Sequence, residues 1–270
     1  MMQTESPLRN RPTAHPATLA AGRNLITIAS GKGGVGKTVL AVSISHALAN
    51  AGKRVLLFDG DVGMANVDIQ LGVMPDKDLA TVISGEFSMT DVAFKIEEGG
   101  FDVIAGRSGS GSLGSLHKSE LSKIRNDIVQ LSEIYDYVIL DLGAGIDEAV
   151  QTLSSGNGPK LVVTTGDPTA LTDAYAYIKI MQQRSPGSAM EVVVNMAKST
   201  DEGEKIYEKL KNACSNFLGI EPPLAGIVLQ DDKVAASIRA QSGLLTRYPT
   251  SNVAQNVEDI AASIMKGAAV

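Results

Sequence analysis

Cysteine is nearly absent from this sequence, which contains only Cys214 among its 270 residues. A single thiol cannot form a disulfide within the chain, and it cannot supply the several thiolates of a structural zinc site or an iron–sulfur cluster. Cys214 falls in a segment with helical apolar spacing, where a free thiol packs as a small hydrophobic side chain. The composition fits a reducing compartment, and we expect a cytoplasmic protein.

The sequence also lacks an apolar run of about 18 residues, the length that a membrane-spanning helix needs. Basic residues are not in excess: 24 Lys and Arg stand against 30 Asp and Glu, a net charge of −6. Proteins that bind nucleic acid mainly through backbone phosphates are usually basic, so direct nucleic-acid binding is not expected. Residues 1–23 carry arginines and prolines without the continuous apolar core of a secretory signal. We expect them to form a flexible arm that precedes a single domain at residues 24–270.

Seven short apolar runs rich in β-branched residues alternate with longer segments whose apolar residues recur at helical spacing. The runs predict buried strands and the segments predict helices. This alternation is typical of an α/β fold in which helices cover both faces of a mostly parallel central sheet. The predicted strands are residues 25–30, 54–61, 101–106, 137–143, 160–167, 191–197 and 224–229. The predicted helices are residues 38–51, 78–84, 89–94, 118–133, 169–182, 202–217, 231–240 and 252–265.

A glycine-rich stretch, SGKGGVGKT, lies between the first predicted strand and the helix after it, and it contains the pattern Gly-x-x-x-x-Gly-Lys-Thr. Glycines let backbone N–H groups turn toward phosphate oxygens, and the helix start adds its positive end. We expect Lys37 to neutralise the β- and γ-phosphates of a nucleotide and the Thr38 hydroxyl to bind Mg²⁺. The predicted phosphate loop consists of Gly31, Lys32, Gly33, Gly34, Val35, Gly36, Lys37 and Thr38.

Carboxylates end two of the predicted strands: Asp59 and Asp61 end the second, and Asp141 ends the fourth. In a parallel sheet these ends meet at the edge where ligands bind. A carboxylate there can hold the waters of Mg²⁺ or orient an attacking water. We therefore predict a metal site at Thr38, Asp61 and Asp141, and we leave Asp59 open between this role and a structural one.

The early lysine of the phosphate loop, Lys32, is not needed for the general pattern. With it, KGGVGKT resembles the deviant Walker A motif of the MinD/ParA ATPases, a family of P-loop NTPases. In that family the early lysine reaches across a dimer interface to the partner's nucleotide. The resemblance implies a homodimer with ATP between two protomers, in which Lys32 and Lys37 act with Asp61 in ATP hydrolysis.

Two further segments resemble the family's switch regions. DGDVGMANVD resembles switch I, which implies that Asp61 orients the attacking water and that Asn66 contacts the dimer partner. DLGAGI resembles the start of switch II, which implies that Asp141 is the Walker B aspartate. Gly143 stands where many members have proline or alanine, and a glycine frees the backbone at that point.

Base recognition is predicted near Asn195, which follows an apolar strand. Its amide offers a donor and an acceptor suited to a base edge, although a turn-forming asparagine would fit the same position. The segment NMA resembles an adenine contact of the family, and GIVLQDDKV resembles the adjacent loop. In this loop Leu229 stands where the family usually has proline, and Asp231 stands where the family also has aspartate.

The segment GDPTALTDAYAYIKIM, residues 166–181, reads physically as a strand end, a Pro turn and a helix with Thr169 as its N-cap. The amino-acid sequence of this segment, like that of NMAKSTDEGEKIYEKL, resembles the FlhG branch of the family, also called FleN. The resemblance covers about residues 24–265. It implies a slow ATPase, cycling between ATP and ADP with Mg²⁺, that regulates flagellar number and placement. The implied partners are an FlhF-type GTPase, basal-body components or a flagellar transcription activator, which would bring the protein to a cell pole.

Relatives often end in a basic amphipathic membrane helix, but the polar face of residues 252–265 carries Glu258 and Asp259. We expect this helix to pack on the core and not to act as a stable membrane anchor. Two alternative functions stay open. One is a MinD- or ParA-type ATPase that positions a division site, DNA or another polar cargo. The other is a nucleotide-dependent scaffold with little or no hydrolysis, which greater mobility at Gly143 would favour.

Overall fold

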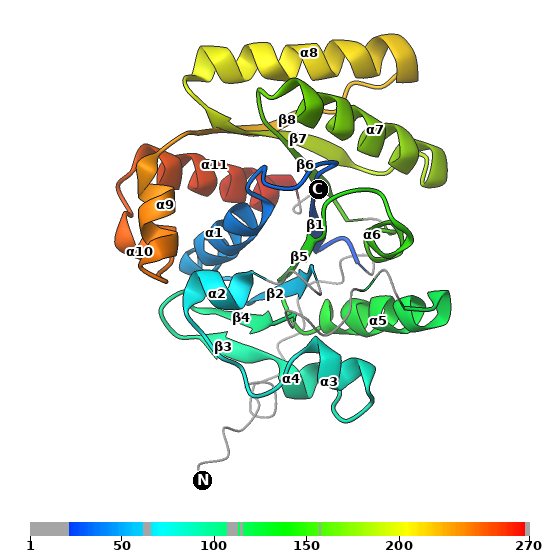
Figure 1. Ribbon diagram of the computed structural model, residues 1–270, viewed down its shortest axis with the longest axis vertical. Coiled ribbons are helices and arrows are strands. Elements are labelled where there is room, and N and C mark those ends of the chain that lie inside the picture. Colours follow the sequence, from blue (N-terminus) through cyan, green and yellow to red (C-terminus); the bar gives the residue numbers. More distant parts are fainter. Residues whose placement is uncertain (1–21, 62–65, 107–112, 114–115, 157, 268–270) are drawn as a thin grey trace.

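The protein is described by a computed structural model at residues 22–61, 66–106, 113, 116–156 and 158–267 (Figure 1). These residues form an eight-stranded sheet in the order β3-β4-β2-β5-β1-β6-β7-β8, parallel except at β3. Its strands are β1 (Leu25–Ala29), β2 (Val55–Gly60), β3 (Phe94–Ile96), β4 (Phe101–Ile104), β5 (Tyr137–Leu142), β6 (Lys160–Thr164), β7 (Met190–Ala197) and β8 (Leu224–Leu229). The α/β fold with a mostly parallel sheet is confirmed, as are all seven predicted strands. Of the expected N-terminal arm, residues 1–21 lie outside the described part of the chain.

Eleven helices lie within the described residues. The eight predicted helices are present within a few residues of the expected bounds, and α2, α6 and α10 are additional. These three have only four to six residues each, too few to show a 3.6-residue period in the sequence. The helices are α1 (Lys37–Asn50), α2 (Val67–Leu71), α3 (Leu79–Ile83), α4 (Met89–Val92), α5 (Lys118–Leu131), α6 (Glu148–Leu153), α7 (Pro168–Arg184), α8 (Thr200–Leu218), α9 (Asp232–Arg239), α10 (Leu244–Arg247) and α11 (Asn252–Gly267).

The edge strand β3 differs from the prediction. The helix predicted over residues 89–94 is wrong at its end, because α4 stops at Val92 and Phe94 already begins β3. β3 pairs antiparallel with β4, and its three residues are too short to give an alternating pattern in the sequence. The sheet edge opposite to β8 is therefore formed by β3, a strand that the hydrophobic periodicity of the sequence did not predict.

Successive residues of each strand point to opposite faces of the sheet, so the core has two halves. Leu56 and Phe58 of β2 pack with the helices α3 to α8, whereas Val55 and Leu57 pack with α1, α10 and α11. In Figure 1, α7 lies beside α8 near β6–β8, and α1 lies beside α11. Helices thus cover both faces of the sheet. The ends of the strands are the part of the sheet that stays available for a binding site.

The C-terminal helix α11 packs on the core as expected. Its buried residues face α1 and β8, and Ile260 lies so close to Gly226 that a β-carbon at position 226 would come within 2.6 Å of it. Among the described residues, no helix combines the length and apolarity needed to cross a membrane. Cys214 is fully buried in α8, and burial raises the pKa of its thiol to about 11, in agreement with a packing role.

Candidate nucleotide-binding site

The predicted site residues gather at the carboxyl edge of the central strands. β1 lies between β5 and β6 in the sheet, and β2 lies on the far side of β5. Asp59 of β2 is directly opposite Asp141 of β5 in the strand register. The phosphate loop leaves the end of β1 next to them, so Lys37 interacts electrostatically with both Asp141 and Asp61. The parallel order of three strands therefore brings the cation and the carboxylates into one site.

The phosphate loop depends on glycine at three positions. Gly34 and Gly36 have φ angles of 80° and 90°, a left-handed conformation that other residues rarely adopt. Gly31 lies so close to the backbone of Asp173 in α7 that a β-carbon at position 31 would overlap with it. Gly36 is also the N-cap of α1, and no side chain caps this helix. The first N–H groups of α1 are therefore free of a side-chain cap, which is the arrangement that binds phosphate oxygens.

Lys37 is the buried cation of the site, with 8% of its surface exposed. Burial lowers the pKa of its ammonium group, and the charges of Asp141 and Asp61 partly oppose this effect. A buried charge needs compensation from opposite charges nearby. The lysine and the two carboxylates therefore stabilise one another's charged forms.

Asp141 is fully buried, and burial raises the pKa of its carboxyl group to about 7, with Asp59 adding repulsion. The hydroxyl of Thr38 faces Asp141 and lowers this pKa, although the pair falls outside ordinary hydrogen-bond geometry. Neither carboxylate oxygen of Asp141 accepts a hydrogen bond from any described residue. Buried acceptors without partners are costly in a protein interior, and such groups are typical of a functional site.

Asp59 holds the two ends of the predicted switch I segment. Its Oδ1 accepts a hydrogen bond from the N–H of Asp61 at 3.2 Å, and its Oδ2 accepts one from the N–H of Val67 at 3.3 Å. Burial raises the pKa of Asp59 to about 6, and these two backbone hydrogen bonds oppose the rise. For Asp59 this geometry favours the structural role. Residues 62–65 lie outside the described part of the chain, while Asn66 is exposed and is the N-cap of α2.

Asp61 is half-buried at the start of the predicted switch I segment and lies beside the predicted switch II segment. Burial raises the pKa of its carboxyl group, Lys37 lowers it, and the charge of Asp147 raises it again. Asp147 is a neighbour that the sequence did not reveal as part of the site. It caps α6 by accepting a hydrogen bond from the N–H of Val150 at 2.8 Å. An aspartate before a short helix does not by its sequence indicate a contact with another loop.

Gly143 of the predicted switch II lies against Asp61. A β-carbon at position 143 would be 3.3 Å from Asp61 Oδ1 and 3.8 Å from its Cγ. The backbone of Gly143 is outside the left-handed region, so alanine could adopt the same conformation. The glycine therefore provides space for the Asp61 carboxylate, in addition to any freedom that it gives to the backbone.

The residues predicted to contact a base are held by other parts of the chain. Asn195 is buried, and its amide Nδ2 donates a hydrogen bond to the backbone oxygen of Val35 at 2.8 Å. The N–H of Leu229 donates to Asn256 Oδ1 of α11 at 3.2 Å. Asp231 caps α9 by accepting a hydrogen bond from the N–H of Lys233 at 2.9 Å. Asn195 thus ties the end of β7 to the phosphate loop, and the other two residues fix the loop after β8.

Met196, next to Asn195, was not singled out from the sequence. It has a φ of 58°, one of two positive values among the described residues other than glycine. Its side chain is partly exposed, and its methyl carbon lies 3.3 Å from the position that a β-carbon of Gly36 would occupy. An unusual backbone conformation at the end of a strand is thus combined with a contact to the phosphate loop.

Lys32, at the front of the phosphate loop, contacts α7 of the same chain. Its Nζ lies 3.3 Å from Asp167 Oδ2 and also contacts the hydroxyl of Thr169. The prediction that Thr169 is the N-cap is wrong, since α7 begins at Pro168 and Asp167 is its N-cap. Proline is favoured at the first helical position, so the chain can enter the helix one residue earlier than expected.

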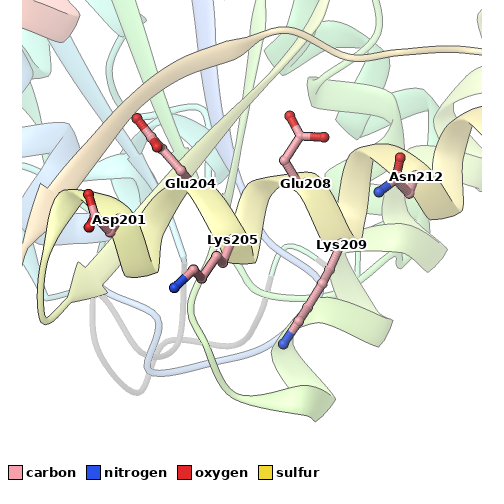
Figure 2. A pocket seen from close by; sticks show the side chains of 6 residues that line it. All are labelled: Asp201, Glu204, Lys205, Glu208, Lys209 and Asn212. Atoms are coloured by element: carbon pink, nitrogen blue, oxygen red, sulfur yellow. The ribbon is translucent and has the colours of Figure 1, made fainter.

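The hollow drawn in Figure 2 has no part in this site. All six of its lining side chains belong to exposed residues of α8, and none belongs to the phosphate loop or the predicted switch segments. Three of the residues are acidic, two are basic and one is an amide, a mixture that is usual on a solvated helix face. They are Asp201, Glu204, Lys205, Glu208, Lys209 and Asn212.

The exchange Gly143→Ala tests the contact between the switch segments. A β-carbon at this position requires its neighbour Asp61 to move by a few tenths of an ångström. We expect this shift to slow phosphate release from ATP about two- to tenfold, because the orientation of water predicted for Asp61 depends on the position of its carboxylate. The affinity for nucleotide should not change. Steady-state phosphate release and binding of a fluorescent ADP measure the two quantities.

The matched control is Ala144→Gly, which loosens the same exposed segment without adding an atom next to Asp61. We expect phosphate release by this variant to resemble that of the unmodified chain. An equal loss in both variants, or undiminished release by Gly143→Ala, would contradict the steric explanation.

Known proteins share this fold and sequence over most of the chain. The family model of the CobQ/CobB/MinD/ParA nucleotide binding domain matches residues 26–244. Antiactivator FleN of Pseudomonas aeruginosa is 32% identical over 240 residues, which cover 89% of this chain and 85% of that protein. Flagellum site-determining protein YlxH of Helicobacter pylori is 32% identical over 238 residues, covering 87% and 80%. The cell division ATPase MinD of Pyrococcus furiosus has a TM-score of 0.75 and 25% identity, covering 90% and 99%. The chain therefore belongs to the CobQ/CobB/MinD/ParA nucleotide-binding family.

Proposed function

We propose that this protein is a molecular switch that dimerises with ATP, hydrolyses it, and thereby regulates the number or placement of flagella. The observation that carries the chemistry is Asp141, whose two buried oxygens are unpaired beside Lys37 and the phosphate loop. The flagellar role is supported by the similarity to FleN and YlxH over more than four fifths of the chain.

The residues at the strand ends fit Mg²⁺. The Thr38 hydroxyl and the carboxylates of Asp61 and Asp141 would hold the ion or its waters, and unpaired acceptor oxygens are the ligands that it prefers. No group of three or more acidic, histidine or cysteine side chains forms a metal cluster in the described residues. This agrees with a magnesium that shares its coordination with phosphates and water and takes only one or two carboxylates. When bound, Mg²⁺ would neutralise charge on the phosphates.

The chain's own groups then have separate tasks. The loop N–H groups and Lys37 bind the phosphates, and the buried site strengthens this attraction because little water screens it. Asp61 accepts a hydrogen bond from the attacking water and orients it toward the terminal phosphate. Asn195 keeps the phosphate loop in place through its hydrogen bond to Val35. Its remaining oxygen and the loop from Leu229 to Asp231 would contact the adenine.

Two residues that a single chain does not need for nucleotide binding would contact the second protomer. Lys32 would reach the nucleotide of the partner, and Asn66 would contact the partner near switch I. A terminal phosphate that contacts both protomers favours the dimer, and its loss by hydrolysis favours the monomer. The surface formed by the dimer would bind a flagellar regulator. The candidates are an FlhF-type GTPase, a basal-body component or a transcription activator in the cytoplasm, and such a partner would determine any polar position.

Hydrolysis is tested by Asp61→Ala. We expect phosphate release to fall at least about tenfold, because the variant cannot orient water. Nucleotide binding should persist, since Lys37 and the phosphate loop are unchanged. Asp76→Ala removes an exposed carboxylate outside the site and serves as the control. If the unmodified chain and Asp61→Ala release phosphate equally slowly, the protein is a nucleotide-dependent scaffold and the hydrolysis proposal is wrong.

The two-chain site is tested by Lys32→Ala. We expect the monomer to bind nucleotide largely as before, because Lys37 still contacts the phosphates. ATP-dependent dimerisation should be lost, which sedimentation velocity with a slowly hydrolysed ATP analogue would measure. Lys53→Ala, which removes another exposed lysine, should dimerise like the unmodified chain. If Lys32→Ala dimerises with the same affinity as the unmodified chain, Lys32 is an ordinary surface charge and the two-chain site is wrong.

The biological role is tested by deleting the gene and counting flagella per cell. We expect the number or position of flagella to change, and the gene encoding Asp61→Ala should fail to restore the normal pattern. Unchanged flagella together with displaced division sites or mislocated DNA would favour the alternative, a positioning ATPase. The similarity to MinD over 90% of the chain motivates this second candidate.

A further inference from the structure

Lys32 is already bound within its own chain. Its Nζ forms an ion pair with Asp167 Oδ2 at 3.3 Å and contacts the hydroxyl of Thr169. Both partners belong to the start of α7 and are 135 and 137 positions away in the sequence. The ion pair is accessible to solvent, with 39% of the Lys32 side chain and 50% of the Asp167 side chain exposed. The lysine proposed to act on a partner's nucleotide therefore has a competing contact.

Asp167 uses a different oxygen for each of its tasks. Oδ1 caps α7 by accepting hydrogen bonds from the N–H of Thr169 at 2.7 Å, from its hydroxyl at 2.7 Å and from the N–H of Ala170 at 3.4 Å. Oδ2 is left for Lys32. The hydrogen bonds from Thr169, together with that from Lys32, hold the pKa of Asp167 at about 2, so the carboxylate is charged at neutral pH. Loss of the lysine would leave the helix cap intact.

The backbone around Lys32 is fixed on both sides. Gly31 lies directly on the backbone of Asp173 in α7. The hydroxyl of Ser30 donates a hydrogen bond to the backbone oxygen of Lys32 at 2.7 Å. The backbone is therefore anchored, whereas the lysine side chain is long and has many rotamers. A change of partner by Lys32 requires only movement of its side chain.

We propose that Asp167 is a positioning residue that keeps Lys32 on its own chain. It thereby opposes dimerisation until Lys32 can contact ATP that is bound by a second copy of the chain. This inference rests on the proposed function, in which Lys32 acts across the dimer interface. Because one ammonium group cannot occupy both places, the contact with Asp167 and Thr169 competes with the contact between chains. Exposed ion pairs are weak, so the contact raises the protein concentration needed for dimerisation and does not prevent it.

The test is Asp167→Asn in the full chain. Asparagine keeps an oxygen that can cap α7 but loses the charge that attracts Lys32. Sedimentation velocity with a slowly hydrolysed ATP analogue gives the protein concentration at which half of the chains are dimeric. We expect this concentration to fall about two- to fivefold, in line with the strength of an exposed ion pair. Asp201→Asn makes the same change of charge at the start of the neighbouring helix α8 and should leave the concentration unchanged.

Two further variants show whether Asp167 acts through Lys32. Asp167→Glu restores a carboxylate, and we expect its dimerisation to return toward that of the unmodified chain. Lys32→Ala with Asp167→Asn should stay monomeric, like Lys32→Ala alone. If Asp167→Asn lowers the melting temperature, Asp167→Ser is used in its place, because serine also caps a helix and cannot form an ion pair with lysine.

The outcomes separate the inference from the proposed function. If Lys32→Ala is monomeric but Asp167→Asn dimerises no more readily than the unmodified chain, the competing contact is overturned and the two-chain site stands. If Lys32→Ala still dimerises normally, the two-chain site fails and the inference fails with it. If Asp167→Asn promotes dimerisation equally with and without Lys32, Asp167 acts by another route and the inference is overturned.

Discussion

The mutual stabilisation of buried charges at the ends of β1, β2 and β5 governs the arrangement of the site. Lys37 is buried where its ammonium group would be unfavourable alone, and Asp141 is buried where its carboxylate would be unfavourable alone. Each is tolerable because the other is near. This requirement explains why the fold places a cation-bearing helix start next to two strand ends.

The phosphate loop is held from two directions by elements that are distant in the sequence. α7 lies against its front at Gly31 and Lys32, and the end of β7 holds its rear through Asn195. β6 lies between β1 and β7 in the sheet, and α7 follows β6 directly. The neighbouring half of the sheet therefore fixes the loop, while the half formed by β2 and β5 supplies the carboxylates. Movement of either half relative to the other would change the site.

Much of this arrangement could be predicted from local patterns. The seven parallel strands and the phosphate loop have strong signals, because a buried parallel strand needs an apolar run and the loop needs glycines at fixed spacing. The elements missed, such as β3 and α6, are too short to show a period. The contacts of Lys32 with Asp167 and of Asn195 with Val35 span 135 and 160 positions. Such contacts depend on how the elements are brought together, and a single sequence contains no pattern for them.

Asp59 has a mechanical consequence for the segment between β2 and α2. One carboxylate binds the backbone at Asp61 and at Val67, so both ends of this segment are attached to the same rigid strand. A single side chain therefore sets both the point at which the backbone leaves β2 and the point at which α2 begins. Loss of this one carboxylate would release both attachments at once, and α2 would no longer be tied to the end of β2.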